Sequence, residues 1–174
     1  MIAPSSKNEA SPQIGDVFKI GLSASSLGFG QIIDTYKAKM LLVAIFDVQR
    51  AADLPVAIEG VLASSAIFVC NTLDALLWHG RWQVIGQVPP DHERFPLPNY
   101  KVDIGGRLMV ENFGATKARA ATPPELDLLD FRTCYAPIGV ENALKAHFGL
   151  QPWEDRFDAL RACRPLRGAR INVA

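Results

Sequence analysis

The densest group of residues that could do chemistry is Asp91-His92-Glu93. A histidine titrates near neutral pH and a neighbouring carboxylate can orient its ring. The triplet therefore suits general acid–base work, and it leaves a divalent metal open as an alternative, although no cofactor is predicted. The competing interpretation is a solvated loop tip, because prolines flank the triplet on both sides.

Other nucleophiles are scarce. Cys70 stands in an apolar segment and would meet His79 or His92 only through the fold, so a packed thiol is the alternative interpretation. The three histidines are not at metal-ligand spacing on one element, and the sequence contains neither a G-x-S-x-G elbow nor a P-loop. No motif in the sequence therefore assigns a reaction.

The charge balance and the cysteine content bear on the binding partners and the cellular compartment of the protein. The 174 residues hold 18 Lys and Arg against 18 Asp and Glu, so no net field favours nucleic acid or a membrane as a partner. An acidic patch nevertheless precedes Phe131 and consists of Glu125, Asp127 and Asp130. Three widely spaced cysteines predict reduced thiols and a cytoplasmic location.

Hydrophobic periodicity predicts a single domain over residues 14–174 after a disordered arm over residues 1–13. The expected strands are 16–22, 29–36, 40–48, 66–70 and 82–87, an edge strand at 56–62, and a hairpin of 100–104 with 107–112. A helical turn is expected at 72–78, and helices at 138–148 and 153–163, the last stopped by Pro165. The result is an α+β fold, in which a curved, mostly antiparallel sheet forms a partly open barrel with C-terminal helices.

Four segments between residues 14 and 102 form a recognisable pattern: Gly15-Asp16 with Phe18 and Ile20, Gly28-Phe29-Gly30, the apolar run 41–47, and Trp82 with Ile85-Gly86 before a Pro-containing loop. In this pattern the chain resembles the immunity protein 26 family of bacterial toxin systems. Gly21 stands where the family commonly has a proline. The family name is shared with a small phosphotriesterase of the HocA type, which degrades organophosphates, so the resemblance implies two functions of different classes.

The first implied function is a bacterial immunity protein that binds and neutralises a cognate toxin. Many toxin sites are basic, so the expected contacts are acidic or lie beside acidic residues: Asp91, His92, Glu93, Glu125, Asp127 and Asp130. We adopt this function as the sequence-based prediction.

The alternative is a hydrolase of phosphotriesters, so the sequence leaves open whether the protein is an enzyme. His92 would be the general base, oriented by Asp91 or Glu93, and Arg94 would lie near the phosphoryl oxygen. Cys70 or Cys134 would be the second choice, as a covalent nucleophile.

Overall fold

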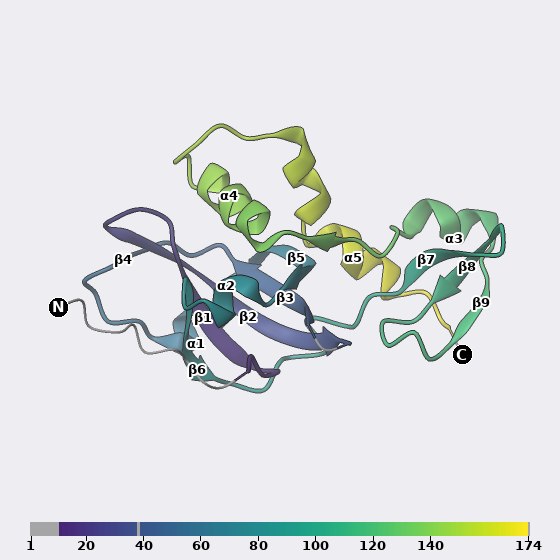
Figure 1. Ribbon diagram of the computed structural model, residues 1–174, viewed down its shortest axis with the longest axis horizontal. Coiled ribbons are helices and arrows are strands. Elements are labelled where there is room, and N and C mark those ends of the chain that lie inside the picture. Colours follow the sequence, from purple (N-terminus) through teal and green to yellow (C-terminus); the bar gives the residue numbers. More distant parts are fainter. Residues whose placement is uncertain (1–10, 38, 174) are drawn as a thin grey trace.

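The computed structural model describes residues 11–37 and 39–173. The predicted arm over residues 1–13 lies outside this part of the chain except for residues 11–13, which form no helix or strand. The class is α+β, as predicted: the strands form two sheets, and the longer helical segments follow them towards the C-terminus (Figure 1).

Within the described residues, the larger sheet has seven strands and is open, not closed into a barrel. Its spatial order is β10 (Cys134–Tyr135), β5 (Ala66–Leu73), β3 (Met40–Phe46), β2 (Ser26–Tyr36), β1 (Asp16–Gly21) and β6 (Trp82–Gln87), and β4 (Arg50–Ala51) pairs with β2. All neighbours are antiparallel except β10 and β5. Strands β1, β2 and β3 form an antiparallel meander, and β3 is buried along almost its whole length.

The glycines of the Gly28–Gly30 segment allow close packing against the neighbouring side chains. A Cβ atom built at Gly30 would stand 2.5 Å from Cζ of Phe18 and 2.7 Å from Cδ1 of Ile45, so a side chain at this position has no room. The irregularity in the ladder lies further along, between Ile32 and Asp34. The glycine therefore serves packing against the neighbouring strands, and the bulge is a separate feature.

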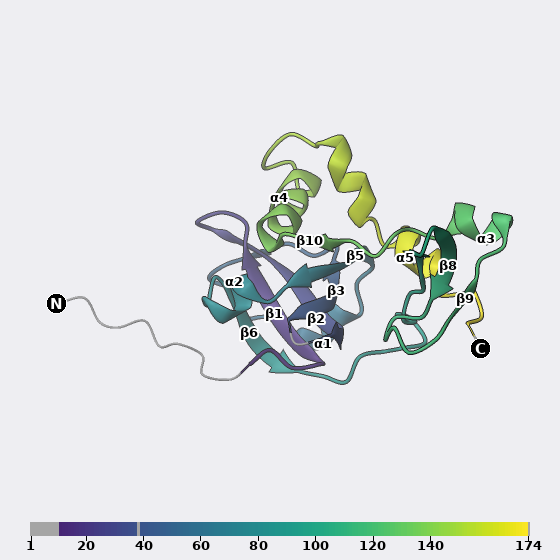
Figure 2. The same ribbon diagram turned by 45° about the vertical axis from the view of Figure 1, so that its right-hand side comes forward.

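The smaller sheet consists of β7 (Tyr100–Ile104), β8 (Arg107–Glu111) and β9 (Ala118–Ala120). The predicted hairpin is confirmed, and Gly105 and Gly106 both have positive φ, at 62° and 81°, as a two-residue turn of this kind requires. Strand β9 and the helix α3 (Pro123–Leu128) were not predicted. Two adjacent prolines, Pro123-Pro124, usually indicate a loop, but in this chain they occupy the first positions of a helix. Figures 1 and 2 show this sheet and α3 to one side of the larger sheet.

The predictions for segments 56–62 and 153–165 are wrong. The segment 56–62 holds the short helix α1 (Ile58–Leu62) instead of an edge strand. The predicted helix 153–163 is a 3-10 helix, η1 (Asp155–Leu160), followed by α5 (Cys163–Gly168), which contains Pro165. Pro165 is the third residue of α5, where a backbone N–H has no intrahelical partner to lose, so it does not stop this helix. Cys163, at the start of α5, is exposed.

The remaining helices cover one face of the larger sheet. The predicted C-terminal helix is α4 (Pro137–His147), and the helical turn before β6 is α2 (Ala75–Trp78). Helices α4 and η1 pack on the face that carries Phe18 and Ile20, and α5 lies between the two sheets (Figure 2). The opposite face is covered by Val61 of α1, by Phe95 and by the start of β7.

Arg132, whose side chain is 11% exposed, joins the two sheets. The guanidinium of Arg132 lies 4.1 Å from the ring centroid of Tyr36, on β2, and 4.3 Å from that of Tyr100, on β7. Its Nη2 also donates to the Glu111 carboxylate of β8 at 3.0 Å. Each such cation–π contact contributes about 0.5–2 kcal/mol, depending on desolvation. The smaller sheet is therefore held on the larger one by side chains from both.

Candidate functional site

The acidic loop, which we define as residues 91–93, is exposed at its tip and ordered at its base. One carboxylate oxygen of Asp91 accepts hydrogen bonds from the backbone N–H groups of Glu93 at 3.0 Å and Arg94 at 3.1 Å. Asp91 therefore shapes the turn. His92 and Glu93 are exposed and make no side-chain hydrogen bond or ion pair within the part of the chain that the structure describes.

Arg94 anchors this loop to the larger sheet. Its guanidinium donates to the backbone carbonyls of Leu62 and Ser64, at the end of α1. It also lies 4.9 Å from the ring centroid of Phe95 and 5.8 Å from that of Phe46. Through these contacts the guanidinium attaches the loop to the sheet. It therefore points inward, away from a ligand at the tip of the loop.

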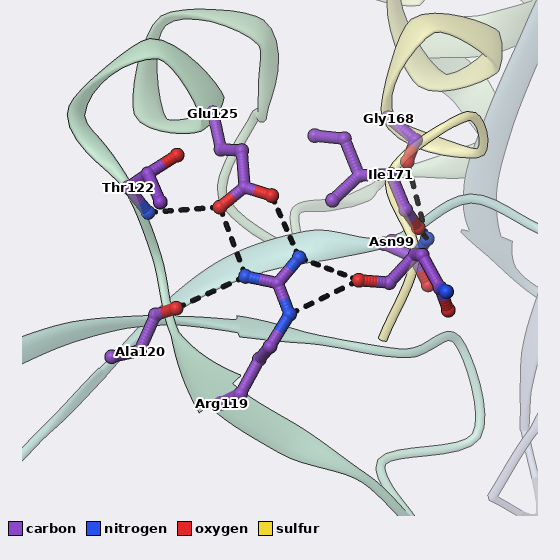
Figure 3. Close-up of polar contacts among 8 residues, drawn as sticks. Asn99, Arg119, Ala120, Thr122, Glu125, Gly168 and Ile171 are labelled. Carbon is purple, nitrogen blue, oxygen red and sulfur yellow. Dashed lines mark hydrogen bonds and ion pairs between the residues drawn. The ribbon is translucent and has the colours of Figure 1, made fainter. Parts of the chain in front are cut away.

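Glu125 of the acidic patch is held by a pair of hydrogen bonds from Arg119, as Figure 3 shows. Its two carboxylate oxygens lie 2.6 and 2.9 Å from the Arg119 guanidinium, and one of them also accepts the backbone N–H of Thr122 at 2.8 Å. The hydrogen bond from Arg119 is the main reason that the pKa of Glu125 falls to about 2. This carboxylate caps α3 and fastens it to β9.

The other two members of the acidic patch differ from each other. Asp130 forms an ion pair with Arg164 of α5, at 2.6 Å. Asp127 is exposed and has no ion pair with any described residue. The acidic loop is anchored on the larger sheet, whereas Asp127 belongs to α3 on the smaller one. The six predicted contact residues therefore lie in two separate places on the surface.

Neither of the two candidate nucleophilic thiols is fully exposed, because Cys70 is buried and Cys134 is half-buried. Cys70 is buried within β5, and burial raises its pKa to about 12, with a smaller contribution from the nearby Cys134. Burial also raises the pKa of Cys134. Because the thiolate is the nucleophile, a thiol that stays protonated at neutral pH reacts slowly. Neither His79 nor His92 contacts Cys70 or Cys134 within the described residues, so the structure does not assemble a Cys–His pair there.

Two kinds of feature are missing from the described ranges. No group of three or more His, Cys, Asp or Glu side chains within residues 11–37 and 39–173 is placed to hold a metal ion. No helix in the same ranges is long and apolar enough to cross a membrane.

A depression of about 580 Å³ was missed by the sequence analysis. We call it the Trp78 depression; it is lined by residues 11–14, by Thr35, Lys37, Lys39 and Leu41 of the β2–β3 hairpin, and by Asp74, Ala75, Trp78 and His79 of α2 and its flanks. The signal in the sequence was weak. Trp78 ends the predicted helical turn 72–78, but the sequence alone does not say that the tryptophan faces solvent.

Phe18 and Trp82, two of the residues on which the family resemblance depends, meet in the core. Their rings stack with centroids 5.1 Å apart and planes within 4° of each other. The Trp82 ring is 1% exposed, and its Nε1 donates to the buried carboxylate of Glu141 on α4 at 3.3 Å. These positions therefore specify the packing of β1, β6 and α4, and they are not themselves surface contacts.

The fold and its surface features define an α+β sheet protein whose predicted polar residues lie mainly on exposed loops and helix ends. Comparison with known families gives the particular group. The family model for immunity protein 26 matches residues 13–108, and the chain belongs to this family. The match runs from just before β1 to the start of β8, so α3, α4, η1 and α5 lie beyond it. Searches of curated proteins and of solved structures gave no significant match.

Proposed function

We propose that this protein binds a cognate protein toxin and neutralises it. Membership of the immunity protein 26 family is the observation that carries the proposal. The architecture is compatible with it, because a sheet fixed on both faces offers loops held in constant positions, and rigid loops lose little conformational entropy on binding.

The proposed contacts are the acidic loop and the acidic patch, led by His92, Glu93 and Asp127. These three side chains are exposed and have no ion-pair partner among the described residues, so they are available to a basic surface. Asp91 takes part by shaping the loop. Glu125 and Asp130 add negative potential, but their carboxylates already bind Arg119 and Arg164. Complementary charge of this kind speeds association more than it deepens affinity.

The test pairs the chain with the toxin encoded near its gene in the native host. Cells that express the toxin should grow when the chain is co-expressed, and the two proteins should co-purify in near-equal amounts. Reversing two free charges, with Glu93→Lys and Asp127→Lys, should lower the association rate by about tenfold or more at low salt. Asp53→Lys, which changes an exposed carboxylate elsewhere, is the matched control.

Two results would count against different parts of the proposal. If no partner co-purifies and the chain gives no protection, the toxin-binding function is wrong. If protection persists and both charge reversals leave the association rate unchanged, the function stands and the acidic contact surface is wrong.

A cytoplasmic location is part of the same proposal. It is supported by three cysteines that are all free, which fits a reducing compartment. The phosphotriesterase alternative gains no support from a specific contact, because Arg94 is engaged with backbone carbonyls and burial keeps the Cys70 thiol protonated. We therefore propose no second function.

A further inference from the structure

The Trp78 depression exposes large apolar side chains that the core does not use. Trp78 is 52% exposed and Ile14 is 44% exposed, although both line the same hollow. Leu77, the neighbour of Trp78 in α2, is 4% exposed and makes the contact of this helix with the core. Trp78 is therefore free to contact something other than its own fold. Tryptophan is enriched among the residues that dominate binding energy at protein interfaces.

Two lysines give the hollow its charge. Lys37 and Lys39 stand on the β2–β3 hairpin, and neither forms an ion pair with any residue that the structure describes. The Nζ atom of Lys37 lies 5.1 Å from the ring centroid of its neighbour Tyr36. Against these two ammonium groups the lining contains one carboxylate, that of Asp74. Without counting His79, the hollow thus carries an excess of positive charge.

From this geometry we infer that the Trp78 depression binds an acidic segment of a protein partner. An Asp or Glu side chain would pair with Lys37 and Lys39, and an adjacent apolar side chain would pack on Trp78 and Ile14. A volume of about 580 Å³ accommodates a few side chains of this kind. A peptide fits better than a free phosphate, because an inorganic anion would leave the exposed indole without a contact.

This inference goes beyond the proposed function and does not rest on it. The acidic loop offers negative charge to a basic surface, whereas the Trp78 depression offers positive charge to an acidic one. Its lining residues from 13 onwards lie within the span that matches the family model, whereas the acidic patch lies beyond that span. The two surfaces are therefore separate contacts of opposite sign.

The experiment uses the full chain and a displayed library of random 12-residue peptides. Selected peptides should contain Asp or Glu next to an apolar residue, and their binding can be measured by fluorescence anisotropy. Trp78→Ala should weaken binding by about tenfold or more, as for a dominant interface residue. The double variant Lys37→Glu with Lys39→Glu, which keeps the tryptophan, should abolish the selection of acidic peptides. Leu150→Ala and Lys117→Glu are the matched controls, because both residues are exposed elsewhere.

Three results would overturn the inference. The first is a selection that enriches no acidic peptide. The second is binding that is unchanged both in Trp78→Ala and in the lysine double variant. The third is displacement of the peptides by millimolar inorganic phosphate, which would make the hollow a phosphate site. A circular dichroism spectrum of each variant separates loss of binding from loss of folding. None of these results bears on toxin protection through the acidic loop.

Discussion

The substitution Glu141→Gln should destabilise the fold, because a single buried carboxylate connects α4 to β6. Glu141 is 1% exposed. One oxygen accepts from Nη2 of Arg81 at 2.6 Å and from Nζ of Lys145 at 2.7 Å; the other accepts from Nε of Arg81 at 3.0 Å and from Nε1 of Trp82 at 3.3 Å. A glutamine replaces one of these oxygens by an NH2 group, which then faces donors.

The size of the destabilisation depends on which donors find a new hydrogen-bond partner in the variant. Hydrogen bonds to charged groups contribute about 1.5–3 kcal/mol each, and the amide loses two of them. Part of this loss is offset, because the side chains of Arg81 and Lys145 are 52% and 22% exposed and can turn to water. Removing a buried charge offsets a further part. We expect a net loss of about 2–3 kcal/mol in the free energy of unfolding, which for a chain of this size lowers Tm by about 5–10 °C.

The assay is urea denaturation followed by far-ultraviolet circular dichroism and tryptophan fluorescence. Glu154→Gln is the matched control, since Glu154 pairs with Arg156 in an ion pair whose side chains are 48% and 67% exposed. That control should change the free energy of unfolding by less than about 0.5 kcal/mol. In a double-mutant cycle, Arg81→Ala and Glu141→Gln should be less than additive, because they remove the same hydrogen bonds.

The pH dependence gives an independent check. Burial alone would raise the pKa of Glu141, but the hydrogen bonds from Arg81 and Lys145 outweigh burial and lower it below its usual value of 4.5. A carboxyl group with a lowered pKa stabilises the folded state above the pKa of the unfolded chain, and this stabilisation is lost as the pH falls towards the folded pKa. The difference in free energy of unfolding between wild type and Glu141→Gln should therefore have its full size at pH 7 and shrink below pH 4.5. A variant as stable as the wild type at pH 7, or a difference that grows in acid, would refute the reasoning.

Three further predictions concern titration, thiol reactivity and catalysis. The Glu125 carboxyl should titrate near pH 2 in carbon-13 NMR spectra, and Arg119→Ala should move this midpoint up towards 4.5, because the arginine donates the hydrogen bonds that favour the ionised form. In the folded protein at pH 8, a thiol reagent should label the exposed Cys163 and leave the buried Cys70 unlabelled until urea unfolds the chain. The purified protein should not hydrolyse a chromogenic aryl phosphotriester above the buffer rate, with or without a chelator.

Each of these predictions has a clear contrary result. A Glu125 midpoint that is the same in the Arg119→Ala variant would mean that the ion pair of Figure 3 does not control its titration. Rapid labelling of Cys70 in native buffer would mean that β5 opens readily, and it would reopen the question of a reactive thiol. Turnover of the phosphotriester that follows the protein peak through a sizing column, and is lost in His92→Ala, would establish an enzyme in place of a binding module.

Local features of the sequence predicted most of the sheet. Strand β6 was predicted with its observed bounds, and the hairpin of β7 and β8 within one residue, because side-chain alternation and the Gly105-Gly106 turn are properties of neighbouring residues. The edge strand predicted at 56–62 is wrong because short apolar runs fit a strand and a helix equally well. What made it a helix is packing, since Ile58 lies against Gly86 of β6, where a Cβ would approach Cδ1 of Ile58 to 2.4 Å.

The candidate contact residues were only partly predictable for a related reason. The sequence identified every acidic residue that the proposed function uses, but it did not distinguish the free carboxylate of Glu93 from that of Glu125, which is bound to Arg119. Pairing depends on which side chains the fold brings together. The sequence likewise gave no sign that Lys37 and Lys39 stand beside Trp78, because the hairpin and α2 are more than thirty residues apart and meet only in the folded chain.

The amino-acid sequence by itself therefore determined the α+β class, the positions of the main strands along the chain, and the resemblance carried by Phe18, Trp82 and the glycines of the matching segments. These features depend on periodicity, turn residues and steric limits that act within a few residues. The tertiary structure alone decided that Glu141 would meet Trp82 across 59 positions, that Arg132 would join the two sheets, and that Trp78 would face solvent. Such contacts arise from long-range packing, in which burial and pairing are set by the whole fold and not by the local pattern.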